Sequence, residues 1–159
     1  MKKYKSILIV ANLLVLLVLF HSSVWQKETI LEDGKMLYFE LAPVDPRSLM
    51  QGDYMRLSYA ISRRLQPKKK RGYCIVQTDN NGIAKLVRLQ TKVLPLKEGE
   101  YAIRFNKKDW QTTVGADSFF FEEGQARKYG KAKYGLVKVD KKGHDILVGL
   151  ADKELKEIK

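Results

Sequence analysis

The stretch 73-YCIVQTDNNGIAKLVRLQ-90 decides the fold, because it places two apolar runs on either side of a tight turn. The runs over 73–79 and 83–90 are short and rich in residues that favour strands. Asn80, Asn81 and Gly82 separate them, and Asn-Gly supplies the positive φ angles that a short hairpin turn needs. The sequence therefore predicts an antiparallel hairpin over 73–90.

Other short strands are predicted on both sides of this hairpin. The segment 36-MLYFEL-41 is aromatic and bounded by Gly34 and Pro43, and 101-YAIRF-105 alternates apolar and polar residues. A second hairpin is expected where 134-YGLVKV-139 and 145-DILVGL-150 flank a turn that contains Gly143. The run 119–121 is interpreted as core, and 122–132 can hold a short helix. Such a pattern predicts a mainly β fold, a small β-sandwich or open barrel with one or two short helices.

The first twenty-five residues predict a single transmembrane helix. Lys2, Lys3 and Lys5 precede an apolar run over 7–20, and a helix over 4–24 would rise about 31 Å, close to the thickness of a bilayer core. A cleavable signal peptide has the same charged start and a similar apolar length. Cleavage requires a small residue at the third-last position before the cut, and a cut after Ser22 or Ser23 would place Phe20 or His21 there. The sequence therefore favours an uncleaved signal-anchor over 1–25.

This anchor sets the expected domain organisation. Lysines before the span favour a cytoplasmic N-terminus, which places the remainder of the chain outside the cytoplasm as a single-pass protein of the cell membrane. We expect a linker over 26–35, an extracytoplasmic β-rich domain over 36–152 and a charged tail over 153–159.

The formal net charge of +12 suits an anionic partner. Outside the cytoplasm nucleic acid is a poor candidate, and no aromatic residues alternate with the basic ones as they do in single-strand binders, so we expect no nucleic acid. Anionic lipid head groups are the alternative. A basic cluster around Pro67 is either a solvated hairpin tip or a contact for acidic lipid or an acidic partner. It consists of Arg63, Arg64, Lys68, Lys69, Lys70 and Arg71.

The segment before residue 53 carries signals for a short helical turn. Asp45 is a suitable N-cap, Pro46 suits the first helical position, and Gly52 suits the left-handed position that ends a helix. One or two helical turns are therefore predicted over 46–51. Arg47 has no structural role in this interpretation and is predicted to pair with a nearby carboxylate or with a ligand.

A strand is predicted to follow this turn. Asp53 can close the turn by accepting a backbone N–H, and the strand begins at Tyr54. Alternation places Met55, Leu57 and Tyr59 on one face, where Leu57 and Tyr59 are expected to face the core.

The segment 52-GDYMRLSY-59 matches, letter for letter, the signature of the GDYXXLXY family of membrane-anchored bacterial proteins. Asp45, Pro46 and Arg47 also resemble that family's approach to the motif, and the likeness extends over about 35–150. The resemblance implies an extracytoplasmic domain that often accompanies a polytopic membrane protein. It brings no catalytic residues to carry over.

Catalytic and cofactor chemistry have little material in this sequence. Cys74 is the only cysteine, which excludes an intramolecular disulfide and a CxxC site, and it is predicted to be a small buried hydrophobe. His21 and His144 lie at the membrane edge and in a turn. No metal-ligand spacing and no phosphate-binding glycine loop is present, so we expect no metal and no cofactor.

One enzymatic alternative is a serine/lysine peptidase. Ser48 shortly before a methionine is faintly similar to type I signal peptidases, with Lys85 or Lys92 as the general base if burial lowers its pKa. The lysine motif of the signal peptidases is not reproduced around 88–100. The favoured prediction is a non-catalytic accessory or binding domain that associates with a polytopic membrane protein. An anionic-lipid-binding module is the second possibility.

Overall fold

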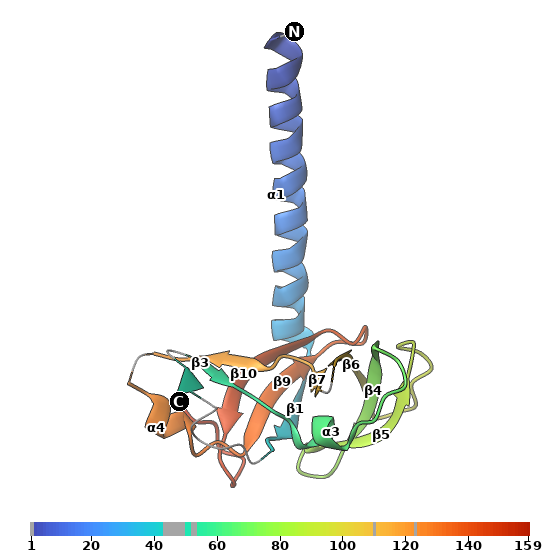
Figure 1. The fold of residues 1–159 in the computed structure, drawn as a ribbon, viewed down its shortest axis with the longest axis vertical. Helices are drawn as coiled ribbons and strands as arrows, with labels where there is room; N and C mark the ends of the chain where they lie inside the picture. The colour runs from blue at the N-terminus through green and yellow to red at the C-terminus, as the bar shows by residue number, and fades with distance from the viewer. Residues whose placement is uncertain (1, 43–49, 52–53, 110, 123) are drawn as a thin grey trace.

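The computed structural model describes residues 2–42, 50–51, 54–109, 111–122 and 124–159. A long N-terminal helix stands on a mainly β domain (Figure 1), which confirms the predicted fold class. The helices of the described part are α1 (Lys2–Asp33), α3 (Ala60–Arg64) and α4 (Ala126–Tyr129). The strands are β1 (Lys35–Glu40), β2 (Met50–Gln51), β3 (Tyr54–Arg56), β4 (Arg71–Thr78), β5 (Ala84–Gln90), β6 (Glu100–Lys108), β7 (Gln111–Val114), β8 (Ser118–Phe120), β9 (Tyr134–Val139) and β10 (Asp145–Ala151).

Helix α1 is long and apolar enough over Ile7–Asp33 to cross a membrane, and none of its most apolar part is buried against the domain. It continues through most of the segment 26–35, for which we predicted a linker, and β1 follows almost directly. Gln, Lys and Glu in this segment are good helix formers, and extending an existing helix requires no new nucleation. At the end of α1 the Ile30 side chain packs on the domain and is only 4% exposed.

Both predicted hairpins are present. Strands β4 and β5 pair antiparallel around the Asn-Gly turn, where the Asp79 carboxylate accepts the N–H groups of Asn81 and Ile83, each at 3.0 Å. Strands β9 and β10 pair around the Gly143 turn. Each hairpin belongs to a larger sheet, in the order β5-β4-β6-β7 for the first and β1-β9-β10 for the second.

The two sheets curve around one core as a half-barrel. A parallel bridge between Tyr38 and Ile83 joins β1 to the start of β5, and Tyr38 N–H donates to Gly82 O at 3.0 Å. Helix α3 contributes Ile61 to the same core. The buried side chains are Leu37, Phe39, Tyr59, Ile61, Leu65, Cys74, Val76, Ala84, Ile103, Phe105, Val114, Val137 and Val139. Cys74 is thus the buried hydrophobe that we predicted, and burial raises the pKa of its thiol to about 12.

A smaller apolar cluster lies beside this core, where the sheet β2-β3-β8 and helix α4 pack on Leu150. Phe119 and Phe121 contact Tyr129, with ring centroids 5.1 and 5.3 Å away. Phe120 is 74% exposed, so the core prediction for 119–121 is wrong at this residue, because alternation along β8 turns it outward.

One further expectation needs correction. Met50 and Gln51, predicted as helical, form strand β2 and pair with Met55 and Tyr54, because the pairing satisfies their backbone groups in a sheet. The charged tail over 153–159 begins with a turn and returns to the domain, where Ile158 N–H donates to Leu150 O at 2.8 Å.

Because of the Arg88–Glu100 ion pair, we expect the free energy of unfolding to fall measurably at acid pH. Glu100 accepts Arg88 Nη2 and the Lys97 N–H, both at 2.8 Å, and these bonds, the Arg88 bond first, lower the pKa of Glu100 to about 2. Because the pKa of Glu100 is lower in the folded state, its ionised carboxylate stabilises the protein at pH values above the ordinary glutamate pKa of about 4.3. This contribution to the free energy of unfolding is lost as the pH falls toward 2. Arg88→Met should therefore lower the midpoint of urea unfolding at pH 7. Between pH 7 and pH 3 the midpoint of this variant should fall less than that of the wild type.

The matched control for this measurement is Lys85→Met on the same strand. Lys85 pairs with Asp79 at 3.1 Å, but its side chain is 69% exposed, and exposed pairs contribute little. We expect an almost unchanged midpoint for this control in full-length protein in detergent. Equal acid sensitivity of wild type and Arg88→Met would contradict the role assigned to the pair.

Candidate functional site

The described part of the family-like motif ties distant elements of the domain together. Leu57 and Tyr59 are 6% and 3% exposed, in agreement with the predicted inward face. Leu57 N–H donates to Asp117 O at 2.7 Å. The Tyr59 hydroxyl donates to Ala116 O at 2.7 Å, and its ring meets Phe39 edge-on with centroids 5.5 Å apart. Both side chains therefore have structural roles.

Tyr59 remains a hydrogen-bond donor at physiological pH. Burial raises the pKa of its phenol well above the usual range, and the carboxylates of Asp145 and Asp117 raise it further. A group that stays protonated and already donates to a backbone carbonyl is suited to holding the fold. It is not suited to proton transfer.

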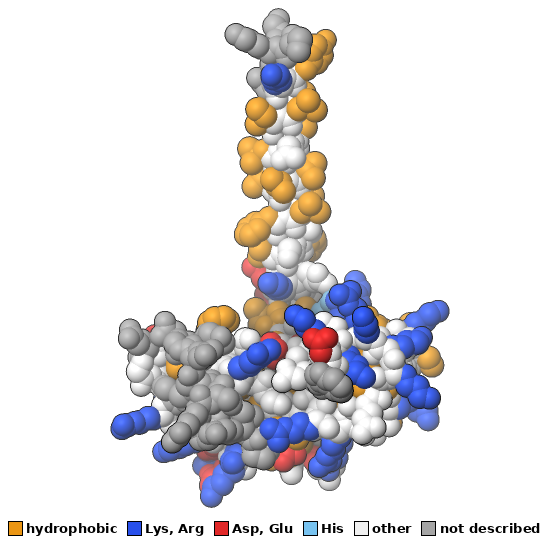
Figure 2. Space-filling view, viewed as in Figure 1, with side chains coloured by type: hydrophobic (Ala, Val, Ile, Leu, Met, Phe, Trp, Pro, Cys, Tyr) orange, Lys and Arg blue, Asp and Glu red, His pale blue; other side chains and the backbone are white. Residues whose placement is uncertain are grey.

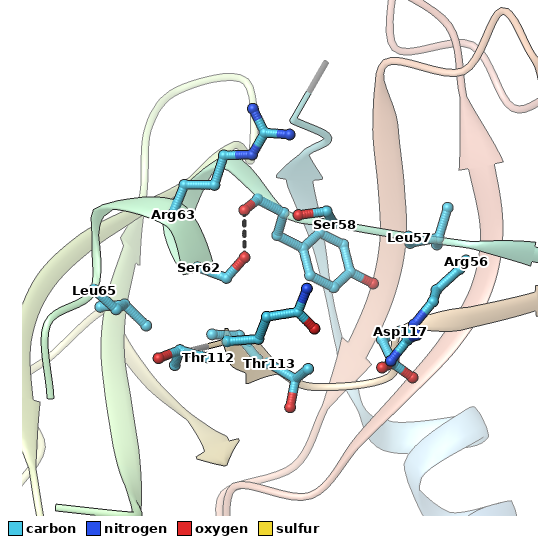
Figure 3. A pocket seen from close by; sticks show the side chains of 12 residues that line it. Arg56, Leu57, Ser58, Ser62, Arg63, Leu65, Thr112, Thr113 and Asp117 are labelled. Carbon is cyan, nitrogen blue, oxygen red and sulfur yellow. Dashed lines mark hydrogen bonds between the residues drawn. The ribbon is translucent and has the colours of Figure 1, made fainter. Parts of the chain in front are cut away.

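A polar groove of about 470 Å³ lies next to this part of the motif, between the strand that contains it, helix α3 and strand β7 (Figure 3). Arg56 and Arg63 lie on opposite sides of the groove, and both are exposed. Its full lining is Arg56, Leu57, Ser58, Tyr59, Ser62, Arg63, Leu65, Gln111, Thr112, Thr113, Val114 and Asp117.

The chemistry of this groove fits binding better than catalysis. Guanidinium groups, hydroxyls, an amide and one carboxylate line it, and these are suited to recognising a polar, acidic segment. Ser62 Oγ already donates to Tyr59 O at 2.6 Å. Within the ranges that the structure describes, no histidine, lysine or cysteine lines the groove. The same ranges hold no cluster of three potential metal ligands.

Several predicted site residues lie outside the described residues. These are Asp45, Pro46, Arg47, Ser48, Gly52 and Asp53. Tyr54 is described at the level of the backbone, and it pairs with Phe120 of β8.

The basic cluster is distributed over α3 and the connection to β4, so its interpretation as a hairpin tip is wrong. Arg63 and Arg64 end helix α3, where a positive charge interacts favourably with the helix dipole. All six side chains of the cluster are exposed. Only Arg63 reaches the groove. Arg71 begins β4, and the first residues of this strand approach the β9–β10 turn, where a Cβ on Gly143 would lie 2.9 Å from the Tyr73 ring. Figure 1 shows α3 on the side of the domain away from α1.

The candidate general bases are both exposed. Lys85 pairs with Asp79 on the hairpin, and Lys92 lies in the loop after β5. Neither lysine has the burial that a lysine general base requires. The peptidase interpretation therefore has no candidate base in this part of the chain.

Sequence reasoning missed the groove wall formed by β7 and Asp117. Strand β7 has only four residues, Gln111–Val114, and only Val114 is buried. A single buried residue gives no detectable alternation.

Comparison with known proteins gives one finding about identity. No curated protein and no solved structure matches this chain. A family model described as "GDYXXLXY protein" matches residues 16–150, which include the end of α1, the motif strand, both hairpins and most of β10. Since this match covers most of the chain, the protein belongs to the GDYXXLXY family.

Proposed function

We propose that this protein is a non-catalytic, single-pass membrane subunit whose domain binds a polytopic membrane protein outside the cytoplasm. The observation that carries the proposal is the arginine-flanked polar groove beside the motif, in a domain joined to an apolar helix without a spacer. An anchored domain of this kind meets partners in the same membrane at high effective concentration.

The membrane placement rests on α1 and its flanking charge. Its apolar side chains are exposed, so lipid or the helices of another membrane protein must cover them. Lys2, Lys3 and Lys5 precede the apolar segment and favour a cytoplasmic N-terminus. The domain then lies on the opposite side of the cell membrane.

The ligand that best suits the groove is an acidic segment of a partner's extracytoplasmic loop. Arginine binds carboxylates through paired, charge-assisted hydrogen bonds, and the groove offers Arg56 and Arg63 with hydroxyl groups between them. A helix-anchored domain needs no high intrinsic affinity, since the partner is confined to the same membrane.

Co-purification tests this function. Full-length tagged protein, purified from its native membranes in mild detergent, should carry a roughly stoichiometric polytopic membrane protein, identified by mass spectrometry. The double variant Arg56→Glu, Arg63→Glu should lower the recovery of that protein by about tenfold or more, because a buried charge pair at an interface contributes about 2–5 kcal/mol.

The matched control is Arg127→Glu on helix α4, which changes charge at an exposed arginine away from the groove. It should retain the partner. A solitary wild-type protein contradicts the subunit proposal, and equal loss in variant and control contradicts the assignment of the groove.

A further inference from the structure

A second cavity lies at the junction of α1 and the domain, and it shares no lining residue with the groove. It has a volume of about 1040 Å³. Its helix side includes Ser22, Trp25 and Ile30, and its domain side includes Tyr101 and the turn between β9 and β10. Trp25 is 68% exposed. The cavity therefore joins an apolar helix surface to a charged turn.

The position of this turn places the cavity at head-group depth. Residues 6–26 contain no Lys, Arg, Asp or Glu, and as a helix they rise about 31 Å, the thickness of a bilayer core. Gln26 Nε2 lies 3.0 Å from His144 Nδ1, so the β9–β10 turn is level with the end of this uncharged segment. Ser22, about one helical turn deeper, also lines the cavity.

The turn presents two lysines in a well-defined geometry. Asp140 Oδ1 accepts the N–H groups of Lys142 and His144, each at 2.8 Å, and Asp140 Oδ2 lies 2.7 Å from His144 Nδ1. The carboxylate of Asp140 is thus occupied within the turn, while Lys141 and Lys142 are exposed and line the cavity.

The charged side chains of the cavity lining are positive on balance, because Lys35, Lys141 and Lys142 outnumber Asp33 and Asp140. Lys138, outside the lining, donates from Nζ to Leu31 O at the end of α1. Figure 2 shows Lys and Arg side chains gathered on the domain surface around the base of the helix. Trp25 suits the interface between hydrocarbon and head groups.

We propose that this junction binds the head-group phosphate of an anionic phospholipid, with Lys141 and Lys142 contacting the phosphate and the acyl chains lying along α1. The inference rests on the insertion of α1 into the membrane, which is part of the proposed function. It differs from the predicted lipid contact of the basic cluster, because none of that cluster's six residues lines the junction cavity.

Native mass spectrometry of full-length protein in detergent tests the site. With equal amounts of phosphatidylglycerol and phosphatidylcholine, wild type should retain phosphatidylglycerol preferentially. Lys141→Ala, Lys142→Ala should reduce that preference about tenfold, since each lysine near an anionic lipid surface contributes substantially to binding. Lys68→Ala, Lys69→Ala removes the same charge from the distal basic cluster and should keep the preference.

The outcomes separate this inference from the proposed function. Flotation of full-length protein with vesicles after an alkaline wash tests insertion, and failure to float overturns both proposals. Normal flotation with an unchanged lipid preference in Lys141→Ala, Lys142→Ala overturns the lipid site alone. Equal loss in the distal variant also overturns it, because net charge would then explain the preference. Excess inorganic phosphate should not displace the lipid, and displacement would contradict a membrane-borne ligand.

Discussion

Tyr59→Ala is expected to lower the free energy of unfolding by about 3–5 kcal/mol, the usual cost of truncating a buried aromatic side chain. Its ring fills the core against Phe39, and its hydroxyl satisfies Ala116 O. The change would leave a cavity where the motif strand meets the half-barrel. Urea unfolding of the full-length protein in detergent, followed by circular dichroism of the β domain, measures the loss.

Tyr59→Phe separates packing from hydrogen bonding. It retains the ring and removes only the bond to Ala116 O, so we expect a smaller cost of about 1–2 kcal/mol. If Tyr59→Phe and Tyr59→Ala cost the same, ring packing would not be the main contribution. If neither changes stability, the motif tyrosine would require a role outside the core.

The parts of the fold that were predictable from sequence have local signals. The Asn-Gly turn and its flanking runs define the β4–β5 hairpin within eighteen residues, and the β9–β10 hairpin has a similar pattern. The inward face of Leu57 and Tyr59 follows from period-two alternation. In each case the determining residues are neighbours in the chain.

The candidate site was only half predictable, because its walls come from distant segments. Arg56 belongs to the motif 52–59 and Arg63 to the basic cluster, whereas Thr113 and Asp117 lie about fifty residues later and carry no motif. Their approach depends on β7 pairing with β6 and on Leu57 N–H donating to Asp117 O. Tertiary contacts of this kind leave no periodic trace in the sequence.

The junction cavity was not predicted from the sequence, because a linker was expected over 26–35. A flexible linker would allow the domain any orientation, and the lysines of the β9–β10 turn would then have no defined depth. The continuous helix changes this, because Ile30 packs on the domain and Gln26 meets His144. The fold thus fixes the position of the β9–β10 turn along α1.

Gly34→Ala is expected to disrupt this junction. A Cβ at position 34 would lie 2.2 Å from Ile30 O and 3.3 Å from Ile30 Cγ2, whereas Gly34 N–H now donates to that same oxygen at 3.0 Å. Since β1 begins at the next residue, relief requires either unwinding of the last turn of α1 or a shift of β1. Overpacking of this kind costs about 1–3 kcal/mol.

Distances between spin labels at Val18→Cys on α1 and Lys131→Cys on the domain should report this loss. Both positions are exposed, and native Cys74 can remain because its thiol is buried. We expect a narrow distance distribution without further change, a broad one with Gly34→Ala, and a narrow one with Lys35→Ala, whose exposed side chain lies one residue later. A narrow distribution with Gly34→Ala would mean that the junction accommodates a Cβ without moving. The orientation proposed to hold Lys141 and Lys142 at head-group depth would then have to come from the contacts of Ile30 and Gln26 alone.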